Sequence, residues 1–227
     1  MTLCKELRVE CDAIFEANFN HPFIEELATG TLSEDIFKEY ILQDSYYLQH
    51  YAKVHALAAA QATDMHTVRR FAQHAEGTCG AEIDLHESYF SLLRVTEQDL
   101  AQFKPAPTAY AYTSHLYRAA MEGDLAATLA ALLPCYWVYY EIGERLKEAT
   151  PNHPIYDKWI AMYSSEWFEQ STNEQIERLN ELTKDLTQKR RAEIKAHFIK
   201  SCHYELQFWE MAYTKQNWDL EKVELQV

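Results

Sequence analysis

The stretch LAATLAALLPCYWVYYEIGERL, residues 125–146, is the most apolar part of the chain and decides the fold class. Apolar side chains recur in it every three or four positions, as they do along one face of an α-helix. That face consists of Leu125, Leu129, Leu132, Cys135, Tyr139, Ile142 and Leu146. Asp124 can cap the helix, and Pro134 should kink it because proline removes a backbone donor. The stretch therefore predicts a long helix buried in a core.

The same helical periodicity continues toward both ends of the chain, and no segment shows sustained alternation of apolar and polar residues. Glycine and proline, which supply the special backbone angles of turns, number only 5 and 6. The sequence therefore predicts an all-α fold, with a loop over residues 95–108. Helices are expected over residues 3–20, 22–29, 33–55, 64–75, 83–93, 109–123, 124–146, 155–163, 176–186 and 194–212.

No linker long enough to separate two domains occurs in the 227 residues. Residues 1–218 are therefore expected to form one helical domain, and residues 219–227 a frayed carboxyl-terminal tail. The longest uncharged run, residues 125–140, contains Pro134, and the first dozen residues carry several charges. These features predict a protein that neither spans a membrane nor is secreted.

The net charge restricts the classes of binding partner, and the cysteine content indicates the cellular compartment. The chain has 35 acidic and 21 basic residues, which gives a net charge of −14. Such a surface repels phosphate backbones and anionic lipids, so neither nucleic acid nor membrane is expected as a partner. The 5 cysteines include no closely spaced pair, which fits reduced thiols in the cytoplasm better than a disulfide framework or a zinc site.

Three predicted helices carry a reactive or ionisable residue in the middle of the apolar face: Asp44, Cys135 and Glu205. A buried carboxylate costs several kcal/mol unless it is neutralised by a partner or lines a solvated pocket. For Asp44 and Glu205, a hydrogen bond to a buried tyrosine or tryptophan is the alternative to a functional role. For Cys135, the alternative is that of a small apolar residue in the core.

The surroundings of Cys135 favour a catalytic role for its thiol over a purely structural one. The thiol follows the predicted kink and lies one helical turn from Tyr139 on the same face, so it could act as a nucleophile in an aromatic pocket. Tyr47, Tyr112 and Tyr163 fall on or beside the inner faces of other helices. Each could simply pack in the core, but converging tyrosines would form a flat slot for an uncharged or cationic heteroaromatic ring.

Histidines on two helices raise the possibility of a metal site. Glu82 and His86 are four residues apart, as are Glu193 and His197. The di-iron motif of helical bundles requires Glu-x-x-His, which is one residue shorter, together with further glutamates. These histidines are therefore predicted to be core or supporting residues, and no metal is expected.

Six segments together resemble the TenA/THI-4 family of bacterial aminopyrimidine aminohydrolases, also called thiaminase II. They are NHPF (20–23), YILQDSYYL (40–48), AYTSHLYRAA (111–120), LLPCYWVYYEIG (132–143), IAMYSSEWF (160–168) and ELQFWEMAY (205–213). The resemblance covers nearly the whole chain. It implies a haem-oxygenase-like helical bundle that forms a homotetramer and uses no cofactor or metal.

The resemblance also implies an activity. The family hydrolyses 4-amino-5-aminomethyl-2-methylpyrimidine, and thiamin less efficiently, to 4-amino-5-hydroxymethyl-2-methylpyrimidine in thiamin salvage. It implies that Cys135 is the nucleophile and Glu205 the proton donor. The remaining implied roles are pyrimidine contacts or pocket lining for Asp44, Tyr139, Tyr163 and Phe208, and tuning of the thiol for Tyr47 and Tyr112.

Two other functions remain open at the level of sequence. One is a non-catalytic pyrimidine-binding regulator, which turnover would exclude. The other is a metal-dependent oxidase on the same bundle, with Asp44, Glu82, His86 and Glu205 as ligands, which metal analysis would detect.

Overall fold

The computed structural model describes residues 1–218, apart from the side chains of Glu82 and residues 84–87. The tail predicted to be frayed, residues 219–227, lies outside this part of the chain.

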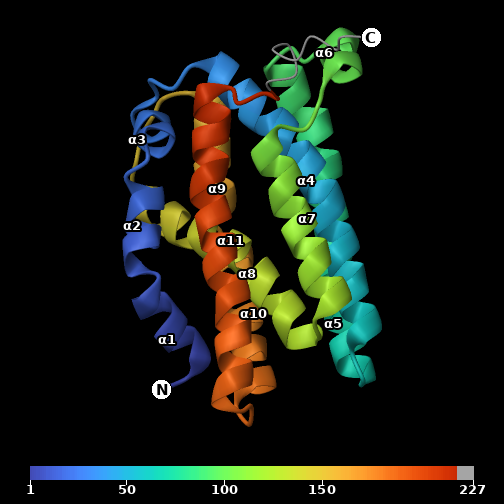
Figure 1. Cartoon of the computed structure of the whole chain (residues 1–227). Helices are drawn as coiled ribbons and strands as arrows, with labels where there is room; N and C mark the ends of the chain where they lie inside the picture. The colour runs from blue at the N-terminus through green and yellow to red at the C-terminus, as the bar shows by residue number, and fades with distance from the viewer. Residues whose placement is uncertain (219–227) are drawn as a thin grey trace, which may run out of the picture.

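Every regular element in the described residues is helical, which confirms the all-α prediction (Figure 1). The elements are α1 (Leu3–Glu10), α2 (Asp12–Phe19), α3 (Pro22–Thr29), α4 (Glu34–Gln61), α5 (Met65–Leu85), a π-helical turn (His86–Phe90), α6 (Glu97–Gln102), α7 (Pro107–Glu122), α8 (Leu125–Leu146), α9 (Pro154–Tyr163), α10 (Glu166–Thr183) and α11 (Gln188–Thr214).

Helix α8 is the central element of the bundle. It crosses behind α11 and packs against α2, α4, α7, α9, α10 and α11 (Figure 1). The Asp124 side chain accepts a hydrogen bond from the Ala127 amide at 3.0 Å, as expected of a cap. By length and composition α8 could cross a membrane, but 78% of its most apolar 18-residue stretch is buried inside the protein. It is therefore the core helix that its sequence predicts.

Several predicted boundaries differ from the structure. Helix α10 begins at Glu166 rather than at residue 176, α11 begins at Gln188 rather than at residue 194, and α4 continues to Gln61 rather than ending at residue 55. Helix α5 runs without a break through Gly77 and Gly80, where the sequence predicts two helices. An isolated glycine costs a helix only about 1 kcal/mol relative to alanine, and the long contact between α4 and α5 offsets it. Conversely, the first predicted helix is divided at Cys11 into α1 and α2.

The predicted loop over residues 95–108 contains the short helix α6. Thr96 and Asp99 form a capping box at its start: each side chain accepts a hydrogen bond from the other residue's amide, at 3.1 and 2.7 Å. This local pairing satisfies backbone donors at the helix start, and it is readable in the sequence as Thr-x-x-Asp.

Gly143 allows α8 and α9 to approach closely. A β-carbon added there would overlap the carbonyl group of Tyr163. We expect Gly143→Ala to lower the free energy of unfolding by roughly 1 to 3 kcal/mol, because overpacking forces the backbone apart. Chemical denaturation measures this loss. Gly80→Ala is the control, since a β-carbon on Gly80 meets nothing within 4 Å, and a similar loss there would contradict the steric explanation.

Candidate active site

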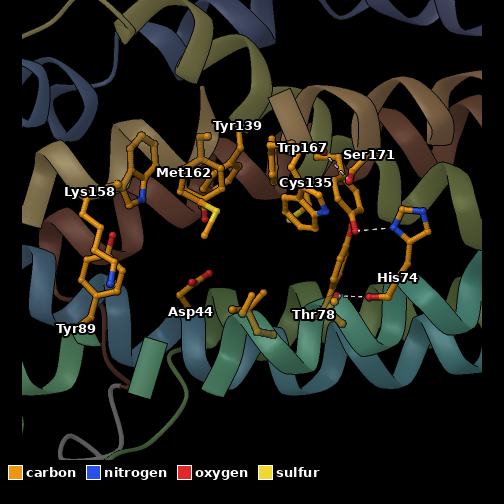
Figure 2. A pocket seen from close by; sticks show the side chains of 18 of the residues that line it. Asp44, His74, Thr78, Tyr89, Cys135, Tyr139, Lys158, Met162, Trp167 and Ser171 are labelled. Carbon is orange, nitrogen blue, oxygen red and sulfur yellow. Dashed lines mark hydrogen bonds between the residues drawn. The ribbon is translucent and has the colours of Figure 1, made fainter. Parts of the chain in front are cut away.

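A cavity of about 500 Å³ lies between α4, α5, α8, α9 and α10. Four of the residues predicted from sequence line it: Asp44, Cys135, Tyr139 and Tyr163. Figure 2 shows Asp44 on one side of the open space, Tyr139 and Met162 opposite it, and Cys135 farther along. Two reactive side chains that are 91 positions apart in sequence thus open into the same space.

The other four predicted residues form a packed layer outside the cavity lining. Glu205, Tyr47, Tyr112 and Phe208 are each at most 3% exposed. The Tyr47 ring lies 5.0 Å from that of Tyr112 and 5.8 Å from that of Phe208, and the Tyr112 hydroxyl donates a hydrogen bond to Glu205 Oε1. The structure therefore separates a lining group from a supporting group that the sequence does not distinguish.

The Cys135 thiol is half-buried at the cavity wall. Burial raises its pKa well above the usual value, and the charge of Glu205 raises it further, while the Tyr47 and Tyr51 hydroxyls act in the opposite direction. Tyr51 donates its hydrogen bond to the Leu132 carbonyl at 2.9 Å. The buried Tyr47 hydroxyl has no partner at hydrogen-bonding geometry among residues 1–218, so it is available to donate to a thiolate.

Glu205 is fully enclosed on α11. Burial raises the pKa of its carboxyl to about 8, although the hydrogen bond from Tyr112 acts against this rise. The carboxyl is therefore mostly protonated at neutral pH and carries a transferable proton.

Aromatic rings fix the shape of the cavity around Asp44. The Tyr139 and Tyr163 rings lie 4.7 Å apart, and the Tyr40 hydroxyl donates to the Tyr139 hydroxyl at 3.3 Å. Trp159 in turn donates its indole hydrogen to the Tyr40 hydroxyl at 3.3 Å. Tyr40 and Trp159, which the sequence analysis did not select, thus orient Tyr139. The signal was present for Tyr40, because it lies one helical turn before Asp44.

A second region of the lining was also missed, and we call it the distal arm. It is formed by Gln73, His74, Gly77, Thr78, Trp167 and Ser171, with Arg70 and Glu174 at its end. The cavity brings these residues together from α5 and α10. Apart from Gly77, where the sequence predicts a break between helices, no sequence signal marks them, because they are ordinary polar or aromatic residues on amphipathic helices.

Hydrogen bonds make the distal arm rigid. Arg70 forms an ion pair with Glu174, and His74 Nε2 lies 3.4 Å from the same carboxylate. His74 Nδ1 lies 2.9 Å from the Tyr136 hydroxyl (Figure 2). Burial lowers the pKa of His74 to about 4, so the ring is neutral at neutral pH. Since a carboxylate only accepts, Nε2 carries the hydrogen, and Nδ1 accepts from Tyr136.

The described side chains include no group of three histidine, cysteine, aspartate or glutamate residues that could hold a metal ion. Glu82 and His86 lie outside those side chains. In the other pair, Glu193 is bound to Arg190 at 2.7 Å, and His197 stacks on His115 at 5.6 Å.

Comparison with known proteins agrees with this architecture. The chain is 50% identical over 218 residues to an aminopyrimidine aminohydrolase of Bacillus subtilis, covering 96% of this chain and 92% of that protein. The structure of a TenA homologue from P. horikoshii OT3 superimposes with a TM-score of 0.84 at 28% identity, covering 94% and 99% of the two chains. A haem-oxygenase-like domain of Shewanella denitrificans, at 20% identity, has a TM-score of 0.72 and covers 94% and 91%.

The haem-oxygenase-like helical fold expected from the sequence is thereby confirmed. Residues 9–215 match the TENA/THI-4/PQQC family. This match spans the cavity lining and the buried layer behind it, from Tyr40 to Phe208. The chain belongs to the TENA/THI-4/PQQC family.

Proposed function

We propose that the protein is an aminopyrimidine aminohydrolase that converts 4-amino-5-aminomethyl-2-methylpyrimidine, and thiamin less efficiently, to 4-amino-5-hydroxymethyl-2-methylpyrimidine. The observation that carries the proposal is the placement of Cys135 and Asp44 on one aromatic cavity, with a buried acid behind the thiol. The name of the Bacillus subtilis relative supports the same activity.

In the proposed reaction, Cys135 is the nucleophile. Its sulfur bonds to a carbon of the pyrimidine ring, and a ring nitrogen takes up the proton. The bond from the exocyclic methylene to the amine then breaks, and the leaving amine takes the proton of Glu205. Water adds to the methylene and returns one proton to Glu205. Finally the carbon–sulfur bond breaks, and the ring recovers its aromaticity as the thiol is restored.

Glu205 serves as the proton donor in this scheme because burial keeps its carboxyl protonated. Hydrogen bonds of catalytic acids are often long before the substrate binds, so the place of Glu205 behind the lining is compatible with this role. The Tyr47 hydroxyl is proposed to donate to the sulfur as negative charge develops there, and Tyr112 to hold Glu205 in place. Phe208 supports Tyr47 by edge contact.

Asp44 is proposed to bind the amino group or a ring nitrogen of the pyrimidine, between the rings of Tyr139 and Tyr163. We expect Asp44→Asn to weaken binding of the product pyrimidine and to lower kcat/KM by about 10²-fold. The reason is that an amide presents a donor where the substrate needs an acceptor. Calorimetric titration with hydroxymethyl-pyrimidine measures the affinity. Unchanged affinity would remove Asp44 from the binding site.

Three further features are part of the proposal. Residues 1–218 act as one domain, the protein is a cytoplasmic homotetramer, and it needs no metal or cofactor. Analytical ultracentrifugation tests the tetramer, and metal analysis of the active protein tests the last point.

The experiment that tests the function is a product assay. The purified protein is incubated separately with thiamin and with the aminomethyl-pyrimidine, and hydroxymethyl-pyrimidine is quantified by chromatography with mass detection. Turnover of the aminomethyl-pyrimidine that persists after chelation supports the proposal. Binding without turnover would instead favour a regulator, and turnover that requires stoichiometric iron would favour the oxidase.

A further inference from the structure

We infer that the distal arm, which lies on the far side of Cys135 from Asp44, holds the leaving group of the substrate. We further infer that this group can be a planar ring that is uncharged or carries a single positive charge. The inference rests on the proposed function, since it names the part of the substrate that this region of the site would take.

The cavity is longer than a substituted pyrimidine. The lining residues of α5 extend from Arg70 to Ala81, which at 1.5 Å per residue is about 17 Å along the helix. The cavity of about 500 Å³ falls within the range of roughly 300 to 1,000 Å³ typical of pockets that bury a drug-sized ligand, which is larger than a pyrimidine with small substituents. A pyrimidine bound at Asp44 therefore leaves a large part of the cavity for something else.

The part of the cavity that the pyrimidine leaves free lies on the far side of Cys135 from Asp44. Figure 2 shows Cys135 between Asp44 on one side and His74 and Thr78 on the other. The bond that breaks must lie near the sulfur. With the pyrimidine on the Asp44 side, the group that leaves points toward the distal arm.

The walls of the distal arm suit a planar ring. The Tyr136 ring is held by its hydrogen bond to His74 and lies 5.7 Å from the Phe168 ring. The Trp167 ring also lines the arm, 6.2 Å from the Phe168 ring, and 55% of this residue's surface is exposed. Thr78 and Ser171 already donate their hydroxyl hydrogens to backbone carbonyls, at 2.8 and 2.9 Å, so they present acceptor oxygens to a ligand.

The charges in the distal arm disfavour an anionic group. The positive charge of Arg70 is paired with Glu174, and His74 is neutral. Outside the arm, Asp44 and Lys158 line the same cavity with one charge of each sign, and the whole chain has a net charge of −14. Among the described residues of the arm, no cation is left unpaired to bind a phosphate, whereas a single positive charge would meet aromatic faces and acceptor oxygens.

Gly77 lies against Trp167 in the wall of the distal arm. A β-carbon placed on it would lie 3.8 Å from Cζ2 of Trp167, in ordinary contact, so any longer side chain would displace this ring or extend into the arm. Gly80, three residues later in α5, is the matched control because a β-carbon there meets nothing within 4 Å and the residue does not line the cavity.

The test compares two substrates that share the pyrimidine. Thiamin has a planar thiazolium leaving group with one positive charge, and the aminomethyl-pyrimidine loses only ammonia. We expect Gly77→Leu to lower the ratio of kcat/KM for thiamin to kcat/KM for the aminomethyl-pyrimidine by about tenfold or more, and Gly80→Leu to change it by less than about twofold. Trp167→Ala should lower the same ratio and Trp167→Phe should largely retain it.

A parallel binding measurement separates this inference from the proposed function. Thiamin is titrated calorimetrically into Cys135→Ser and into the Cys135→Ser, Gly77→Leu double variant, neither of which should turn over. Weaker thiamin binding to the double variant supports the distal arm even if the wild type hydrolyses nothing. Equal binding, or an equal loss of kcat/KM for both substrates in Gly77→Leu, would overturn the inference. Hydrolysis of thiamin diphosphate as fast as thiamin would overturn the charge assignment.

Discussion

Cys135→Ser is expected to reduce turnover of the aminomethyl-pyrimidine by about 10³-fold or more while leaving the fold intact. The two side chains have nearly the same shape, but a serine hydroxyl is a much weaker nucleophile than a thiol at neutral pH. Steady-state kinetics measures the loss, and circular dichroism with thermal unfolding checks the fold. Retention of the wild-type rate would exclude the covalent mechanism.

Cys79→Ser is the matched control for this prediction. Cys79 is exposed on α5 and does not line the cavity, and Cys4, Cys11 and Cys202 are buried in the core. A small alkylating reagent is therefore expected to modify Cys79 readily without loss of activity. Inactivation should follow modification of Cys135, and substrate should slow it. The rate should rise with pH up to strongly alkaline values, because only the thiolate reacts and burial raises the pKa of that thiol. An inactivating label on any other cysteine would contradict the assignment.

Glu205→Gln is expected to lower kcat by about 10² to 10⁴-fold, which is the usual contribution of a positioned proton donor. The glutamine keeps the shape of the side chain but has no transferable proton, so product affinity should change much less than kcat. Kinetics and calorimetric titration of the same variant measure both quantities. Normal turnover at saturation with much weaker product binding would leave Glu205 as a contact residue only.

The same variant has a second readout, which is the stability of the free protein as a function of pH. Because burial raises the pKa of Glu205 from 4.5 to about 8, the stability it contributes is present below about pH 4.5 and lost as pH rises through about 8. Between pH 5 and 9 the wild type should therefore lose roughly 4 kcal/mol relative to Glu205→Gln. Parallel dependence of the two proteins on pH, measured by urea unfolding, would mean that Glu205 ionises normally in the folded state.

Helix class and order were available from the sequence because they depend on local periodicity. The apolar face of residues 125–146 and the cap at Asp124 predicted α8, and the structure has that helix with that cap. Helix boundaries that depend on contacts between helices were predicted less well from the sequence. The continuity of α5 through Gly77 is an example, since packing against α4 offsets a local preference for a break.

The candidate residues were found where polar or reactive groups interrupt an apolar face, as at Asp44, Cys135 and Glu205. Periodicity shows that such a residue points inward, and the motifs of the TENA/THI-4/PQQC family assigned the roles that remain proposals here. Neither shows what the side chain meets. Only the fold showed that Asp44 and Cys135 open into the cavity while Glu205 lies behind it, bonded to Tyr112.

The sequence by itself therefore determined the helical class, the central helix and the inward-facing reactive residues, because these follow from spacing along one chain. The tertiary structure alone decided the distal arm and the raised pKa of Glu205. Both depend on how α5, α10 and α11 are placed in space, and burial by distant segments leaves no mark on the sequence of the residue that is buried.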